Sequence, residues 1–314
     1  MPRYRGRFAP SPTGPLHFGS LVAAVASYAD ARAAQGAWLL RIEDVDVARA
    51  RPTAADAILA TLERFGFTWD GPVWRQSLRG DAYAEVLDRL DAQGLVYACR
   101  CSRRELAGVR LSGIGERVYP GTCRDRARSA LEKPTGRSRA AWRLRAPSTP
   151  VEFIDRHLGR KSQDLATEVG DFVLRRSDGL YAYQLAVVVD DAAQGITDVV
   201  RGADLLASTA RQVFLQRLLG YPTPRYLHVP VAVDARGDKL SKQTRAPALS
   251  GDPLPSLLAA WRFLGQMTPA DAPGSVAGFW EYAQSRWESR RVPRVLALPA
   301  PPAFVAPPAE PARR

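Results

Sequence analysis

The feature that most constrains the fold is the order of the first 44 residues, which predicts two strands joined by one helix. Residues 5–9 have the composition of a short buried strand, and the run WLLRIED after Gly36 is almost continuously apolar, as in a strand covered on both faces. Between them, SLVAAVASYADARAAQG carries apolar residues at helical spacing, with Ser20 as the expected N-cap and Gly36 as the stop. Strand–helix–strand units build parallel sheets, so the sequence predicts an α/β fold.

The loop between the first strand and this helix is expected to be stiff. The segment RFAPSPTGPLHFGS, residues 7–20, contains three prolines, two glycines and one of the chain's three histidines. Proline and glycine restrict the backbone to particular dihedral angles, which suits a loop shaped to hold a ligand. Because ligands of parallel sheets bind beyond the carboxyl ends of strands, we expect this loop and Glu43-Asp44 to share one rim.

Downstream segments predict further helices and strands. We expect helices at residues 54–65 and 82–93, and an amphipathic helix in STARQVFLQRLLG that Gly220 closes. DFVLRRSDGLYAYQLAVVVDD is typical of a hairpin that turns at residues 177–179, and ITDVVRGADLL of a strand and loop. Another helix is expected after KLSKQ, and the last fifteen residues, rich in proline and alanine, are predicted to be disordered.

The positive charge of the chain is concentrated in one region. The 314 residues carry a formal net charge of +12, and residues 97–145 hold thirteen Lys/Arg against four Asp/Glu, which is +9 of that excess. A clustered positive field attracts polyanions, and RNA is the commonest such partner. The alternative is an arginine-rich composition in which these residues form a solvated face.

The chain is expected to be soluble and cytoplasmic. Its start, MPRYRGRFAP, lacks the apolar segment of a secretory signal, and no run approaches the roughly 20 apolar residues of a membrane span. Three cysteines cannot all pair with one another, which fits a reducing compartment better than an oxidising one.

Two short motifs carry a resemblance to a known class of enzymes. PLHFGS, residues 15–20, resembles the HIGH signature of class I aminoacyl-tRNA synthetases, and KLSKQ, residues 239–243, resembles their KMSKS signature. Their order and spacing along the chain match as well. The longer string RFAPSPTGPLHFGS is similar to that of the glutamate-specific branch, and the resemblance covers about residues 5–265.

The resemblance implies a Rossmann-like parallel sheet, an inserted subdomain of the zinc-knuckle and acceptor type, and a C-terminal helical piece that contacts an RNA stem. The two halves of the catalytic domain are then residues 1–96 and 186–245, and the second half contains the KLSKQ loop. The insert is residues 97–185, the helical piece 246–298 and the disordered tail 299–314.

The same resemblance implies that His17 and Lys242 are catalytic residues in amino-acid activation. In that reaction a carboxylate attacks the α-phosphate of ATP, and hydrogen-bond donors and cations stabilise the charge on the phosphates. The ATP site, with Mg²⁺ accompanying the nucleotide, is expected to comprise His17, Gly19, Ser20, Lys239, Ser241 and Lys242. Ser20 and Gln243 replace the usual histidine and serine, but both retain a hydrogen-bond donor. A loop histidine and a surface lysine remain alternatives for His17 and Lys242.

A glutamate site is implied in the same way. Its expected residues are Arg7, Phe8, Ala9, Pro10, Ser11, Glu43, Tyr183 and Arg201. Glutamate carries two carboxylates and one ammonium, so guanidinium groups, one acid and a hydroxyl are chemically suitable. Glu43 would receive the α-ammonium group. A capping role for Glu43 and a surface ion pair for Arg201 are the alternatives.

All three cysteines, Cys99, Cys101 and Cys123, lie within 25 residues, flanked by arginines that favour thiolates. A closed structural zinc site needs four ligands, and no histidine is near these cysteines in the sequence. The resemblance implies that Tyr119 completes a site for one Zn²⁺ per chain. Free buried cysteines are the alternative.

The length of the chain after the KLSKQ motif distinguishes between close relatives. Only 71 residues follow Gln243, enough for stem-contacting helices but not for a complete helical anticodon-binding domain. The chain therefore resembles a truncated branch of the glutamate-specific enzymes. This resemblance implies that the enzyme activates L-glutamate with ATP in the absence of tRNA. It then transfers glutamate to the cyclopentenediol ring of queuosine at the wobble position of tRNA(Asp).

The expected partners are L-glutamate, ATP and the anticodon stem-loop of queuosine-containing tRNA(Asp), whose single-stranded bases suit a basic, aromatic-lined groove. We expect a monomer without membrane contact. Two other functions remain open on the sequence. One is a shortened glutamyl-tRNA synthetase that charges the 3′ end of tRNA, and the other is a non-catalytic module that binds tRNA or senses glutamate.

Overall fold

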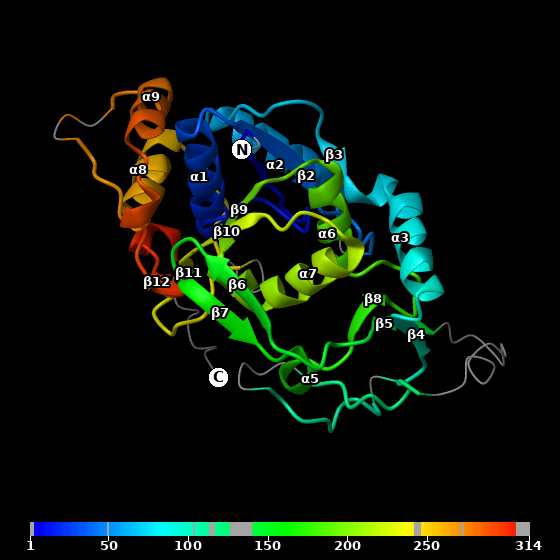
Figure 1. Ribbon diagram of the computed structural model, residues 1–314. Coiled ribbons are helices and arrows are strands. Elements are labelled where there is room, and N and C mark those ends of the chain that lie inside the picture. Colours follow the sequence, from blue (N-terminus) through cyan, green and yellow to red (C-terminus); the bar gives the residue numbers. More distant parts are fainter. Residues whose placement is uncertain are drawn as a thin grey trace, which may run out of the picture.

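The N-terminal strand–helix–strand unit has the predicted parallel arrangement (Figure 1). β1 (Arg5–Phe8) pairs with β2 (Ala37–Ile42), α1 (Phe18–Ala33) connects them, and β3 (Trp74–Arg75) pairs in parallel with β2. The computed structural model describes residues 3–48, 50–102, 104–112, 117–125, 140–241, 246–269, 271 and 273–305.

The start of α1 differs from the prediction. The expected N-cap, Ser20, lies inside the first helical turn, and His17 is the N-cap instead. His17 is held in an extended conformation by an antiparallel bridge to Ala248, and its carbonyl oxygen accepts a hydrogen bond from the amide of Leu21 over 3.0 Å. A contact with a distant segment, which local cap preference does not include, therefore sets the start of this helix.

A second sheet continues the first. Its strand order is β7-β6-β10-β9, with β6, β10 and β9 parallel and β7 antiparallel to β6. The bounds are β6 (Val151–Asp155), β7 (Gly159–Gln163), β9 (Asp198–Gly202) and β10 (Arg225–Val229). β1 lies beside β9, where the Thr197 amide donates to the Arg5 carbonyl oxygen over 3.0 Å. The combined order β3-β2-β1-β9-β10-β6 reverses between β1 and β9, and ligands bind near such a reversal.

Three of the predicted helices form close to their expected positions. They are α2 (Pro52–Arg64), α3 (Gly80–Ala92) and α7 (Leu206–Leu219). α7 ends as predicted at Gly220, which adopts the left-handed conformation with φ +68°. α1 packs on β1, β2 and β9, and α7 packs on β6 and on α6 (Tyr183–Ala193).

The predicted hairpin after residue 172 is wrong in its second half. β8 (Phe172–Arg175) and the turn at 177–179 are present, but the returning strand is a single bridge between Arg175 and Tyr181. The valine-rich run that follows is α6, with residues 185–191 all buried. A helix buried on every side has the same continuous apolar sequence as a buried strand, so periodicity could not separate the two.

The region predicted as an insert is divided between two sheets. β8 joins β4 (Val96–Cys99) and β5 (Ala141–Leu144) in an antiparallel sheet, near the short helix α5 (Leu165–Glu168). β6 and β7, which also lie within residues 97–185, instead belong to the sheet of β9 and β10. Residues 97–185 therefore contribute strands to both sheets, rather than to one separate subdomain.

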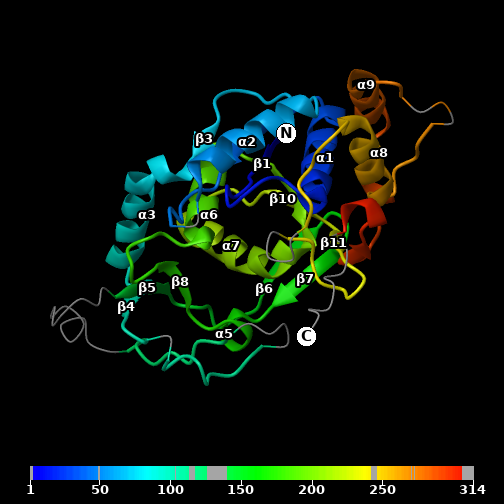
Figure 2. The same cartoon turned by 180° about the vertical axis from the view of Figure 1, so that it is seen from behind.

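The C-terminal helices pack directly against the N-terminal unit (Figure 2). α8 (Pro253–Phe263) and α9 (Val276–Arg286) both contact α1, and the Trp280 indole donates to the Phe65 carbonyl oxygen over 2.8 Å. β11 (Val231–Val233) pairs in parallel with β12 (Ala297–Pro299). Short 3₁₀ helices are η1 (Gln76–Leu78), η2 (Ala203–Leu205), η3 (Ser289–Arg291) and η4 (Pro302–Phe304).

The first part of the predicted disordered tail is ordered. Pro299 lies in β12, and the Phe304 ring stacks on Phe18 with 4.3 Å between ring centroids. The prediction is wrong for residues 299–305 because these apolar side chains pack against the core, and residues 306–314 lie outside the described residues. Among the described helices, none combines the length and the apolar character that crossing a membrane requires.

Candidate active site

A cavity of about 410 Å³ lies where the strand order reverses, at the carboxyl ends of β1 and β9. The loop after β1, the first turn of α1, the end of β9 and the segment before residue 242 all line it. Its walls include these expected residues: Arg7, Phe8, Ala9, Pro10, Ser11, His17, Gly19, Ser20, Glu43, Tyr183, Arg201, Lys239 and Ser241. The remaining expected residue of the two substrate sites, Lys242, lies outside the described residues. Segments far apart in the sequence thus meet at one cavity.

The two signature-like motifs contact each other at this cavity. The bridge between His17 and Ala248 ties the first motif to the segment that follows the second. A Cβ added at Gly19 would lie 3.2 Å from Cε1 of His17 and 3.7 Å from the Leu240 carbonyl oxygen. Glycine at this position therefore permits close packing of the imidazole against the start of α1, whose positive dipole end favours phosphate.

Lys239 reaches the cavity from the second motif. Its Nζ lies 2.5 Å from Oδ2 of Asp204, a residue of η2 that also lines the cavity. Both side chains are partly exposed. The structure therefore places a cation of the KLSK segment beside the end of β9, at a position where a phosphate group could replace the carboxylate as its partner.

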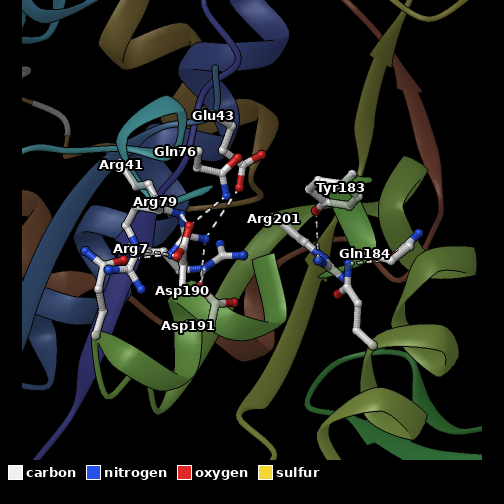
Figure 3. Close-up of polar contacts among 12 residues, drawn as sticks. Arg7, Arg41, Glu43, Gln76, Arg79, Tyr183, Gln184, Asp190, Asp191 and Arg201 are labelled. Atoms are coloured by element: carbon white, nitrogen blue, oxygen red, sulfur yellow. Dashed lines mark hydrogen bonds and ion pairs between the residues drawn. The ribbon is translucent and has the colours of Figure 1, made fainter. Parts of the chain in front are cut away.

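The walls formed by Arg7 and Glu43 rest on a buried charge network (Figure 3). Arg7 on β1 donates through Nε to Oδ1 of Asp191 over 3.2 Å, and Arg41 on β2 donates to the same oxygen over 2.7 Å. Arg41, which is fully buried, also donates to Oε1 of Glu43 over 3.4 Å. The Glu43 amide in turn donates to the Pro10 carbonyl oxygen over 3.0 Å, so the backbone ties this acid to the proline loop.

The pKa values of the two acids of this network are shifted in opposite directions. Burial raises the pKa of Glu43 above its usual value, although Arg41 and Arg7 act in the opposite direction. Burial alone would also raise the pKa of Asp191, but Arg7 and Arg41 hold that pKa below its usual value. Asp191 therefore stays charged as the partner of two arginines, whereas a bound ammonium would favour the charged form of Glu43.

Arg201 is fixed by a second buried network. Its Nε donates to Nε2 of His228 over 3.1 Å, which places the imidazole proton on Nδ1, where it is donated to Asp155 Oδ2 over 2.7 Å. Burial lowers the pKa of His228 to about 4, so the ring is neutral and can accept from Arg201. Nη1 of Arg201 also donates to the Tyr183 hydroxyl over 3.3 Å, joining two expected glutamate-site residues (Figure 3).

Sequence reasoning did not assign Arg41, Asp191, His228 or Asp155 to the site. The available signal was a charged or imidazole side chain inside an otherwise apolar run, as in WLLRIED, VVVDD and RYLHVP. Such residues are rarely buried without a partner, so each predicts a buried ionic or hydrogen-bonded network. Which residues pair with each other depends on the topology of the fold, because the partners lie far apart in the sequence.

The cysteine cluster also assembles. The Sγ atoms of Cys99, Cys101 and Cys123 lie within 4.8 Å of one another. The Tyr119 hydroxyl lies 3.3 Å from Sγ of Cys99 and 3.8 Å from Sγ of Cys101. Burial raises the pKa of Cys101 to about 11, whereas hydrogen bonds, led by the Arg100 amide, lower the pKa of Cys123 despite burial. In a tetrahedral zinc site with Zn–S of about 2.3 Å, neighbouring ligand atoms are about 3.5–3.8 Å apart. The 3.6 Å between Sγ of Cys101 and Sγ of Cys123 lies in this range, and three thiols with one hydroxyl supply four donor atoms.

Several arginines of the basic region bind protein groups. Of the thirteen basic residues in 97–145, six lie outside the described residues. The Arg143 guanidinium lies 3.8 Å from the Tyr119 ring centroid, Arg124 pairs with Asp171 at 3.7 Å, and Arg145 donates to the Gly94 carbonyl oxygen over 3.2 Å. These three side chains therefore stabilise the fold around β4 and β5 as well as adding to the positive charge of this region.

Comparison with known proteins agrees with this geometry. Residues 3–251 match the family of class I tRNA synthetases for glutamate and glutamine (E and Q), in its catalytic domain. A glutamate tRNA ligase from Elizabethkingia meningosepticum, crystallised with its amino acid, shares 26% identity and a TM-score of 0.76 over 93% of this chain and 66% of that one. The chain thus spans about two thirds of that ligase and belongs to the class I tRNA synthetases.

Relatives with higher sequence identity indicate the family within this class. The glutamyl-Q tRNA(Asp) synthetase of Aromatoleum aromaticum is 58% identical over 97% of this chain and 95% of the relative. The enzyme of the same name from Dechloromonas aromatica is 59% identical over 95% of this chain and 99% of the relative. Within its class, the chain belongs to the family of glutamyl-Q tRNA(Asp) synthetases.

Proposed function

We propose that this protein is a ligase that activates L-glutamate with ATP and transfers it to queuosine in tRNA(Asp). The observation that carries the proposal is one cavity lined both by residues suited to glutamate and by the two motifs suited to ATP. Membership of the glutamyl-Q tRNA(Asp) synthetase family supports the acceptor. The activation is independent of tRNA, and the cyclopentenediol ring of the wobble nucleoside receives the glutamyl group.

Activation needs the glutamate held with its α-carboxylate facing ATP. Arg7 and Arg201 provide guanidinium groups for carboxylates, Tyr183 provides a hydroxyl, and Glu43 receives the α-ammonium. An oxygen of the α-carboxylate attacks the α-phosphorus, and the bond from that phosphorus to pyrophosphate breaks. The buried partners of the arginines fix the orientation before the reaction, which lowers its entropic cost.

Residues of the two signature-like motifs stabilise the phosphates of ATP. His17 donates a hydrogen bond, Gly19 and Ser20 present the first turn of α1, and Lys239, Ser241 and Lys242 supply donors and positive charge. Mg²⁺ bound with the nucleotide would neutralise part of the phosphate charge. Lys239 exchanges its contact with Asp204 for the departing pyrophosphate.

Transfer completes the reaction. A hydroxyl oxygen of the cyclopentenediol attacks the carbonyl carbon of glutamyl adenylate, forming an ester bond. The bond from that carbon to the phosphate oxygen breaks, and AMP leaves with the electron pair. The hydroxyl proton passes to the released phosphate or to solvent, so no further reactant is required.

The finer features of the fold belong to the same proposal. Cys99, Cys101, Cys123 and Tyr119 would hold one structural Zn²⁺, which would stabilise the basic part of residues 97–185 next to β4 and β5. Residues 1–96 and 186–245 serve as the two catalytic halves, and β6 and β7 from the segment between them complete the sheet of β9 and β10. The chain acts as a monomer on the anticodon stem-loop, with helices of residues 246–298 on the stem.

The direct test locates the transferred amino acid. Queuosine-containing tRNA(Asp) is incubated with the enzyme, ATP and labelled glutamate, and is then cleaved with ribonuclease. Label on an anticodon-loop fragment is the expected result. Label on the 3′-terminal adenosine would show a shortened tRNA-charging enzyme, and glutamate binding with neither exchange nor transfer would show a non-catalytic module.

A further inference from the structure

A second cavity adjoins the first. It has a volume of about 560 Å³ and shares Ser11, Thr13, Glu43, Tyr183 and Asp204 with the first cavity. His17, Gly19 and Lys239 line the first cavity but not the second. The second cavity therefore opens onto the walls assigned to glutamate and not onto those assigned to ATP, and its volume is in the range of small-molecule sites.

The second cavity has lining residues that the first lacks, among them the aromatic ring of Tyr181 and the ion pair of Asp46 with Arg176. Tyr181 offers an aromatic ring that is half-buried and packs edge-on against Tyr83, with 5.4 Å between ring centroids. Asp46 offers a carboxylate, which Nη1 of Arg176 contacts over 2.8 Å. Arg176 has a second acid partner, Asp178, at 2.5 Å, and Asp178 does not line the cavity. Arg176 therefore remains paired if a ligand cation takes over Asp46.

We propose that this second cavity binds the acceptor nucleoside, with Asp46 contacting its cationic amine and the Tyr181 ring contacting its base. The inference rests on the proposed function and names the residues that select the acceptor. In queuosine a secondary amine, protonated at neutral pH, joins the base to the cyclopentenediol. A carboxylate beside an aromatic ring matches a cation next to a base. Entry from this side directs the diol toward the glutamyl carbonyl across Glu43 and Tyr183.

The test compares variants in two half-reactions. Glutamate-dependent ATP–pyrophosphate exchange involves no acceptor, and transfer to a queuosine-containing anticodon stem-loop requires one. Asp46→Asn is expected to raise the KM for the stem-loop about tenfold or more while exchange stays at the wild-type rate. Tyr181→Leu is expected to raise the same KM about fivefold or more, and Tyr181→Phe to stay within about twofold of wild type.

Two controls address the ion pair itself. Asp178→Asn removes the other acid partner of Arg176 but keeps the Asp46 carboxylate in the cavity, so it should raise the KM for the stem-loop by less than Asp46→Asn does. Arg176→Gln breaks the pair with Asp46 but keeps the carboxylate, so it should not raise the KM for the stem-loop as Asp46→Asn does.

Three results would overturn the inference. They are a wild-type KM for the stem-loop in Asp46→Asn, an equal rise in Arg176→Gln, or a fall in exchange that matches the fall in transfer. Failure of the proposed function looks different, because the wild-type enzyme itself would then place no glutamate on queuosine.

Discussion

At the scale of single residues, the site depends on charges that are buried and paired before any substrate binds. Arg7 and Arg201 both line the cavity, and each is held from behind by a buried partner, Asp191 for the first and His228 for the second. Fixed guanidinium groups lose little entropy when they bind a carboxylate. We therefore expect the residues behind the cavity to affect the affinity for glutamate without contacting it.

Replacing Arg201 with alanine tests whether this guanidinium group binds glutamate. Because Arg201 is expected to contact a glutamate carboxylate, the KM for glutamate in ATP–pyrophosphate exchange should rise about tenfold or more, with little change in the KM for ATP. Arg225→Ala is a matched control on the neighbouring strand. Its side chain is 60% exposed, pairs with Asp198 and does not line the cavity. Equal effects of the two substitutions would remove Arg201 from the glutamate site.

The KM for glutamate is expected to depend on pH through the ionisation of Glu43. Burial raises its pKa against the opposing effects of Arg41 and Arg7, while Asp191 acts with burial. As the pH falls through this raised pKa, Glu43 becomes neutral and no longer attracts the ammonium of glutamate. The KM for glutamate should therefore begin to rise at a higher pH than the usual glutamate pKa of about 4.3 implies.

The control for this titration is Glu43→Gln. The variant should have a high KM for glutamate at neutral pH and should lack the additional rise on acidification. Parallel KM profiles for the variant and the wild-type enzyme would contradict the assignment of this titration to Glu43.

At the scale of elements, the start of α1 and the cysteine cluster are the two local structures with the clearest consequences. A Cβ at Gly19 would make a tight contact with the His17 imidazole, 3.2 Å from its Cε1. The cluster, in contrast, connects β4 with the segment around Tyr119 and Cys123, where few apolar side chains are buried. In the proposed function, the first structure binds the nucleotide and the second holds the zinc ion.

Gly19→Ala is expected to displace the His17 ring, because its Cβ would lie 3.2 Å from Cε1 of that ring. The exchange rate should fall about tenfold, mainly through weaker stabilisation of the phosphates, while the affinity for glutamate is retained. Gly80→Ala, at the start of α3, is the control because nothing lies within 4 Å of a Cβ there. Wild-type exchange in Gly19→Ala would show that the imidazole is not needed in this position.

Metal content can be measured directly on the purified protein. We expect about one zinc per chain by elemental analysis, and less than half of that in Cys101→Ser, with a lower melting temperature. Tyr119→Phe removes only the oxygen ligand and should weaken zinc retention during dialysis against a chelator. A wild-type protein without zinc, stable in the presence of the chelator, would favour free buried cysteines.

At the scale of the whole molecule, the sequence predicted the parts that depend on local pattern. The N-terminal unit, the C-terminal end of α7 and the convergence of the loop after β1 with Glu43 follow from local sequence pattern and from the rule for parallel sheets. α6 and the N-cap of α1 could not be predicted because tertiary contacts decide them. The ordered residues 299–305 likewise depend on a surface formed by Phe18 and its neighbours.

The most direct test of the central claim, that one cavity brings glutamate and ATP together, is ATP–pyrophosphate exchange in the absence of RNA. The account predicts exchange that requires L-glutamate, and that falls strongly in Lys242→Ala while glutamate binding, measured by calorimetry, persists. Exchange that appears only when tRNA is added, or that proceeds equally well without L-glutamate, would contradict it.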